Sequence, residues 1–184
     1  MTAMRRILLT ARTAAPAAAL LGGLLAASGA ALAASPVPLG TFSDWRAFKL
    51  EDGSNTICYA LSQPKDAEPK NVRRGNIYVM VANWPGRSVN GEVSVVPGYP
   101  YRDGSDVTAN VDGSRVTLFT RNDSQNEGGA WVADRAAEAK MIAAMKRGNS
   151  LIVTGTSSRG TLTTDRYSLS GITAAIAAID KACN

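Results

Sequence analysis

The 184-residue chain contains no histidine, and its only cysteines are Cys58 and Cys183. The lack of imidazole excludes Ser-His-Asp and Cys-His nucleophiles and the common histidine-containing zinc sites. A Gly-rich phosphate-binding loop is also missing, because Gly128-Gly129 has neither a nearby lysine nor a strand-to-helix setting. Ser-Lys pairs and paired carboxylates are the catalytic arrangements that remain.

Acidic residues are absent before Asp44, and the N-terminal segment instead carries three arginines and a long stretch rich in Ala. Small residues at Ala31 and Ala33 fit an A-x-A cleavage site. This layout predicts a signal peptide over 1–33 that is cleaved after Ala33, rather than a retained membrane anchor. Three of the 20 basic residues and none of the 15 acidic ones lie in this segment, so the remaining chain has a net charge of +2. Such a balanced charge does not indicate a nucleic-acid partner.

The residues after the signal peptide suffice for one domain. We expect a flexible N-terminal segment over 34–40 and one domain over 41–184. An even number of cysteines in an exported chain favours a disulfide between Cys58 and Cys183, and two buried free thiols are the alternative.

Short runs rich in Val, Ile, Tyr and Thr, separated by Asp-Gly pairs, predict a mainly β fold. The expected strands are 42–48, 57–61, 77–82, 92–96, 107–111, 115–120, 151–155 and 161–169. The sequence Asn83-Trp84-Pro85-Gly86 fits a type II turn. A two-residue loop at Asp112-Gly113 predicts a hairpin with one apolar and one polar face. Its expected pairs are Val111 with Ser114, Asn110 with Arg115, Ala109 with Val116, Thr108 with Thr117 and Val107 with Leu118.

Two helices are expected, one internal and one C-terminal. The first spans about 134–147, with Asp134 as its N-cap, and the second spans about 170–182. Their predicted buried stripes are Ala137, Met141, Ala144 and Met145 in the first helix, and Ile172, Ile176, Ile179 and Cys183 in the second. The expected architecture is therefore an antiparallel β-sandwich or barrel-like single domain with two packed helices.

The segment GTSSRGTLTTDRYSLSG (155–171) is rich in hydroxyl groups. We interpret these as strand and turn residues, and ligand recognition by Arg159, Asp165 or Arg166 is the alternative. For catalysis, Ser157 or Ser158 could act with a lysine. Two of five carboxylates could form a pair, namely Asp44, Glu92, Asp103, Asp106 and Asp165.

Aromatic side chains cluster at the turns NWPG (83–86) and PGYPY (97–101). Trp84, Tyr99 and Tyr101 could form a binding edge, or they could cap the core.

Several stretches of the chain resemble the invasion-associated locus B family of exported alphaproteobacterial proteins. They are FSDWRAF (42–48), CYALSQPK (58–65), EVSVVPGYPY (92–101), AW (130–131), AMKRGNSLIVTGTSSRGTLTTDRYSLSG (144–171) and AC (182–183). The resemblance implies a periplasmic or envelope-associated, mainly β domain with a structural disulfide. In pathogenic members it implies a link to host-cell invasion, and it brings no catalytic residues.

Together these observations predict a non-enzymatic periplasmic protein that binds an envelope or host protein. We expect no nucleic acid, cofactor or metal, and peripheral association with the outer membrane is a further option. A surface-exposed adhesin or invasion factor and a hydrolase are the alternatives. The candidate binding residues are Trp84, Tyr99, Tyr101, Arg159, Asp165 and Arg166.

Overall fold

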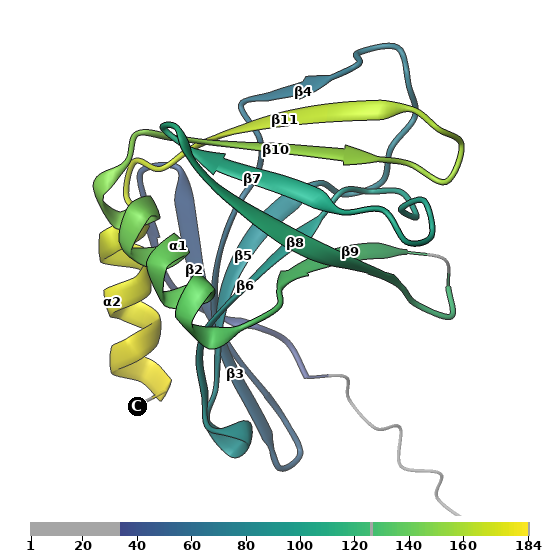
Figure 1. The fold of residues 1–184 in the computed structure, drawn as a ribbon. Helices are drawn as coiled ribbons and strands as arrows, with labels where there is room; N and C mark the ends of the chain where they lie inside the picture. Colours follow the sequence, from purple (N-terminus) through teal and green to yellow (C-terminus); the bar gives the residue numbers. More distant parts are fainter. Residues whose placement is uncertain (1–33, 126, 184) are drawn as a thin grey trace, which may run out of the picture. The chain divides into compact units, whose positions relative to one another are not determined.

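The computed structural model describes residues 34–125 and 127–183, which form a mainly β domain with two α-helices (Figure 1). The strands are β1 (Val37–Phe42), β2 (Trp45–Asp52), β3 (Asn55–Ser62), β4 (Asp66–Glu68), β5 (Tyr78–Trp84), β6 (Val89–Val96), β7 (Val107–Val111), β8 (Ser114–Asn122), β9 (Gly128–Val132), β10 (Ser150–Thr156) and β11 (Leu162–Ser168). The helices are the 3-10 turn η1 (Pro85–Arg87), α1 (Arg135–Arg147) and α2 (Ile172–Cys183). The predicted signal peptide at 1–33 lies outside the described residues.

The eleven strands form one antiparallel sheet in the order β1-β2-β3-β5-β6-β9-β8-β7-β10-β11-β4. The sheet is open, with β1 and β4 at its edges. It twists so strongly that β7, β10 and β11 run at a steep angle to β2 and β3 (Figure 1). The expected mainly β class with two packed helices is confirmed.

Buried side chains from both parts of the sheet form a single core on its concave side. Trp45, Val81, Leu118, Leu151 and Tyr167 are among its large members, and each is fully buried. We call this side of the sheet the inner face and the opposite side the outer face.

Both helices lie on the inner face, where α2 packs on β1, β2, β3 and β5 (Figure 1). The predicted buried stripes are confirmed by Met141 and Met145 in α1 and by the three isoleucines of α2. Asp134 caps α1 as expected, because its carboxylate accepts a hydrogen bond of 2.8 Å from the backbone N–H of Ala137. No helix within 34–125 and 127–183 is long and apolar enough to cross a bilayer.

The predicted hairpin of β7 and β8 has the expected register at all five residue pairs. Asp112 and Gly113 both have a positive φ, as the two-residue loop requires.

Three local predictions were wrong. The region 42–48 is not one strand, because a turn at Ser43-Asp44 places Phe42 opposite Trp45 in a hairpin of β1 and β2. The segment 34–40 is not flexible throughout, since β1 begins at Val37 and pairs with β2. Instead of a type II turn, η1 follows Trp84, and the left-handed residue there is Ser88, with a φ of 51°.

The short strands β4 and β9 were not predicted. β4 is three residues long and carries two acidic side chains, and β9 begins with two glycines. Neither sequence has a composition that favours a strand. Each segment is extended because it pairs with a neighbouring strand.

Candidate functional site

The predicted aromatic binding edge is not a single surface. Trp84 lies at the end of β5, whereas Tyr99 and Tyr101 lie beyond the opposite end of the β5–β6 pair, where Tyr78 is paired with Val96. β5 is seven residues long, so its two ends lie about 20 Å apart. The structure therefore separates Trp84 from the two tyrosines.

Tyr101 is 1% exposed and fills the core instead of capping a turn. Two glycines make room for this segment. A Cβ atom on Gly155 would lie 2.7 Å from the Tyr101 ring, and one on Gly128 would lie 2.4 Å from the carbonyl oxygen of Tyr99. The alternative interpretation of these aromatics as core residues therefore fits Tyr101, and Tyr99 packs half-buried beside it.

Asp165 lies on the inner face of β11, where it forms a buried ion pair with Arg74. The two bonds between the guanidinium and the carboxylate measure 2.6 and 2.5 Å, and the side chains are only 6% and 3% exposed. Arg74 also lies 5.0 Å from the centroid of the Tyr99 ring and donates to the carbonyl oxygen of Pro97. Burial alone would lower the pKa of Arg74. The hydrogen bonds and charge attraction to Asp165 outweigh burial, so the pKa of Arg74 is raised. Sequence reasoning missed Arg74, which lies in a loop of mixed charge.

Three tyrosines surround this ion pair. Burial raises the pKa of Tyr99, Tyr101 and Tyr167, so each phenol stays protonated at neutral pH. The Tyr99 hydroxyl is hydrogen-bonded to Thr163 at 2.5 Å. The Tyr167 hydroxyl is buried and has no hydrogen-bond partner among the described residues. This interior cluster holds the loop before β5 and the PGYPY segment against β11.

The hydroxyl-rich segment acts as the strand and turn residues that its composition suggested. The Ser157 hydroxyl accepts a bond of 3.1 Å from the N–H of Thr161, and the N–H of Ser158 donates to Pro100. Arg159 is exposed at the tip of the β10–β11 turn. Arg166 is exposed on the outer face of β11, opposite Ile152 and Asp66. Neither arginine is on a strand next to β5, which ends at Trp84, because β5 and β11 are not neighbours in the sheet.

The five carboxylates considered for catalysis lie on different elements. Asp44, in the β1–β2 turn, binds Lys65, and this hydrogen bond lowers its pKa. Glu92, on β6, accepts a bond of 3.2 Å from the Trp84 indole. Asp103 and Asp106 are exposed in the loop before β7, and Asp165 is buried with Arg74. Within 34–125 and 127–183, no hydrogen bond joins two of them.

Apolar side chains also cluster on a second surface, and no helix or strand among the described residues covers them. On β3, Cys58, Ala60 and Ser62 are buried toward the core, whereas Ile57, Tyr59 and Leu61 alternate with them and are only half-buried. The outward residues of β2 and β5 extend this surface. We call it the outer aromatic face; on β2, β3 and β5 its members are Phe48, Leu50, Ile57, Tyr59, Leu61, Tyr78, Met80 and Trp84.

The outer aromatic face contains an open groove of about 530 Å³. Asp52 and Asn55 close one end of the groove, and the rest of its lining consists of apolar and aromatic side chains. Phe48 stacks on Tyr59 with a centroid distance of 5.4 Å. Burial raises the pKa of Tyr59 and of Tyr78, so both phenols are uncharged at neutral pH. The groove therefore presents an apolar surface with few polar groups, as in many protein contact sites.

Apolar side chains continue across the sheet beyond the groove. Strand pairing aligns one row from Leu61 through Met80 and Ser94 to Trp131 and Phe119. The rings of Trp131 and Phe119 lie 6.0 Å apart, and Phe119 is 39% exposed. In contrast, the outward positions of the β7–β8 hairpin are Thr108, Asn110, Arg115 and Thr117. The apolar character is thus confined to one half of the outer face.

The sequence carried a signal for this surface that was not used. An antiparallel strand with one wet face alternates apolar and polar residues, as β7 does. β3 (NTICYALS) and β5 (YVMVANW) are instead apolar at consecutive positions. Such a run indicates that both faces of the strand are apolar.

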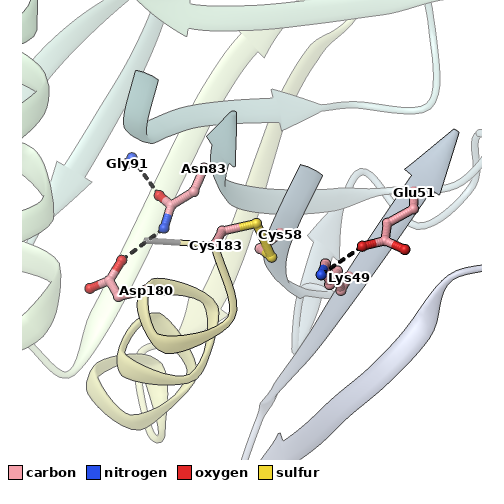
Figure 2. The surroundings of a disulfide bond; sticks show 7 residues. All are labelled: Lys49, Glu51, Cys58, Asn83, Gly91, Asp180 and Cys183. Carbon is pink, nitrogen blue, oxygen red and sulfur yellow. Dashed lines mark hydrogen bonds and ion pairs between the residues drawn. A yellow bond between two sulfur atoms is a disulfide. The ribbon is translucent and has the colours of Figure 1, made fainter. Parts of the chain in front are cut away.

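Directly behind the groove, α2 is fixed to the inner face (Figure 2). The structure contains the expected disulfide between Cys58 of β3 and Cys183 of α2, with Cα atoms 5.9 Å apart. Asn83 is paired with Cys58 in the sheet, and its side chain donates to Asp180 of α2 and accepts from the N–H of Gly91, both at 2.8 Å. These contacts make the three groove strands a firmly supported platform.

Comparison of the chain with models of known protein families found a match. The family model described as "Invasion associated locus B (IalB) protein" matches residues 45–180, so the chain belongs to this family. The matched region contains β2, β3 and β5, and therefore the whole groove. The comparisons with curated proteins and with solved structures found no match.

Proposed function

We propose that this protein is exported to the periplasm and acts there without catalysis, by contacting another protein through the outer aromatic face. The observation that carries the proposal is this face itself, whose half-buried aromatic and aliphatic side chains surround an open groove of about 530 Å³. Contiguous apolar surface on a soluble protein is a feature of partner-binding sites.

Three further observations support the proposal. The N-terminal sequence has the pattern of a cleaved signal peptide. A disulfide joins residues 125 positions apart, and such bonds persist in oxidising compartments. Family membership associates the chain with an envelope protein linked to invasion. The ionisable groups of the interior cluster are committed to structural contacts, which is why we place the function on the outer face.

Site-specific photo-crosslinking in living cells tests the contact. A crosslinker at Tyr59 is expected to give discrete protein adducts, and one at Arg135, exposed on α1 on the inner side of the sheet, is expected to give none. The adducts should disappear when Trp84→Ser is added, because Trp84 lines the same groove. Equal adducts at both positions, or none at Tyr59, would disprove a specific contact at this face.

The adhesin alternative makes a different prediction about accessibility. A periplasmic protein should resist protease in intact cells and become sensitive when the outer membrane is opened. Cleavage in intact cells would instead place the face outside the cell, where it would contact a host protein.

A further inference from the structure

We propose that the protein contacted by the outer aromatic face is a second copy of this chain, bound face to face about a two-fold axis. This inference rests on the proposed function, because it names the partner for the same surface. It is argued from the charges at the two ends of β2, from the strand register and from the size of the face.

The outward side chains of β2 carry opposite charges at the two ends of the strand. Arg46 begins the outward series, Phe48 and Leu50 follow, and Asp52 ends it. Arg46 and Asp52 are both exposed, and neither forms an ion pair within the described residues. A strand with this pattern is complementary to itself when two copies run antiparallel, because each basic end then meets an acidic end.

The strand register shows that one axis would satisfy the three groove strands together. Lys49, Cys58 and Asn83 are aligned across β2, β3 and β5, and all three side chains point away from the outer face. A two-fold axis along this row, in the plane between two facing sheets, places Arg46 opposite Asp52 of the second copy.

The same axis matches the apolar side chains in pairs. Phe48 meets Leu50 of the second copy, and Ile57 meets Tyr59. Facing sheets pack about 10 Å apart, a distance that the long side chains at the rim can bridge.

The size of the face fits a reversible dimer. From β2 to β8 it measures roughly 24 Å across six strands and roughly 20 Å along them. This area of roughly 480 Å² per partner is below the roughly 800 Å² of a standard interface and fits a weak, reversible dimer. Because the groove is open and its polar groups are confined to one end, an enclosed lipid chain or a glycan fits it less well.

Charge exchange on the processed, oxidised protein tests the inference. Sedimentation equilibrium should show a concentration-dependent dimer between about 1 µM and 1 mM. R46D makes both ends of β2 acidic, and D52R makes both ends basic. Each variant alone should dimerise at least about ten-fold more weakly, since two attractions per dimer become repulsions.

The decisive measurement uses these two variants together. An equimolar mixture of R46D and D52R should form a heterodimer, because both end contacts become attractive again, and the R46D/D52R double variant should regain self-association. R135D, a charge reversal at an exposed position of α1 on the inner side of the sheet, should dimerise like the unmodified chain. Circular dichroism of each variant verifies folding.

Two results would overturn the inference. One is a monomer throughout this concentration range, and the other is dimerisation that R46D and D52R leave unchanged. Crosslinking at Tyr59 separates the two proposals. Adducts of a heterologous mass with a monomeric protein would retain the proposed function and reject the second copy, whereas adducts of twice the chain mass support both.

Discussion

At the scale of single residues, the buried pair of Arg74 and Asp165 is the most sensitive point of the domain. Asp165→Asn leaves the guanidinium charge buried without its counter-charge, which costs about 3–5 kcal/mol when one partner of such a pair is removed. The double variant Arg74→Met/Asp165→Leu should lose much less, because it removes both charges. Urea unfolding of the oxidised proteins measures these differences in the free energy of unfolding.

The exposed carboxylate of Asp103 provides the control for this comparison. Asp103→Asn should change the free energy of unfolding by no more than about 0.5 kcal/mol. If Asp165→Asn were as mild, the ion pair would contribute little to stability, and a ligand-binding role for Asp165 would become the better interpretation.

Glu138 provides a pH-dependent test at the same scale. Burial raises the pKa of this carboxyl group, although the N–H of Val93 donates to it and acts in the opposite direction. An acid with a raised pKa in the folded state destabilises the fold when it ionises, so this cost is present at neutral pH and disappears as the pH falls below its ordinary value of 4.5. Glu138→Gln should therefore raise the melting temperature at pH 7.

The benefit of Glu138→Gln should shrink toward zero in melting curves recorded at successively lower pH. Melting curves of the unmodified chain at the same pH values provide the reference for this trend. A melting temperature that falls at pH 7 would mean that the charged bond to Val93 outweighs the cost of burial.

At the scale of secondary-structure elements, the start of α2 depends on Gly171. This residue has a φ of +92°, and a Cβ atom added to it would lie 1.9 Å from the carbonyl oxygen of Phe42. Gly171→Ala should therefore displace α2 from β1 and destabilise the domain by more than the roughly 1–2 kcal/mol of left-handed strain alone. Gly53→Ala is a matched control, because its φ is +60° but a Cβ atom there would have no neighbour within 4 Å.

Thermal unfolding of both glycine variants separates strain from steric overlap. Gly53→Ala reports the cost of the backbone conformation, and the additional loss in Gly171→Ala reports the contact with β1. Equal losses in the two variants would show that α2 can shift to accommodate the methyl group.

The disulfide anchors the other end of α2. Replacing Cys58 and Cys183 by Ala opens a loop with a sequence separation of 125, for which loop-closure entropy gives an upper estimate of about 4–5 kcal/mol. We expect denaturant unfolding to show a loss of about 2–4 kcal/mol, since native contacts of Asn83 and the buried isoleucines still hold the helix. A loss below about 0.5 kcal/mol would indicate that these contacts suffice without the covalent link.

The sequence predicted well those elements that are specified by residues close together in the chain. Asp112-Gly113 supplies both positive-φ residues of its turn, and Asp134 and Gly148 bound α1, so these elements were placed correctly. The β1–β2 turn uses Ser43-Asp44, which contains no glycine, and it was therefore overlooked. β4 and β9 depend on pairing with distant strands, which local composition does not reveal.

At the scale of the whole molecule, sequence reasoning identified the fold class but only one residue of the groove. Trp84, one of the candidate residues, lines the groove, whereas Tyr101 and Asp165 are buried and Tyr99 is half-buried beside them. Their positions depend on how the loop around Arg74 folds back onto β11, and this is a long-range contact without a sequence signature. The outer aromatic face could be predicted only if the order of strands in the sheet were known, since β2, β3, β5 and β9 contribute to it from separate parts of the chain.

The two faces of β5 allow stability and association to be tested separately. Val81 is fully buried on the inner face, and the adjacent Met80 lines the groove on the outer face. Val81→Thr places a hydroxyl in the core and should cost about 1–3 kcal/mol in urea unfolding, with little effect on association of the folded protein. Met80→Thr should cost less than about 1 kcal/mol but weaken association, because it removes apolar contact area from the interface alone. If instead Met80→Thr destabilised the fold as much as Val81→Thr and left association unchanged, the outer aromatic face would be part of the structural core rather than a contact surface.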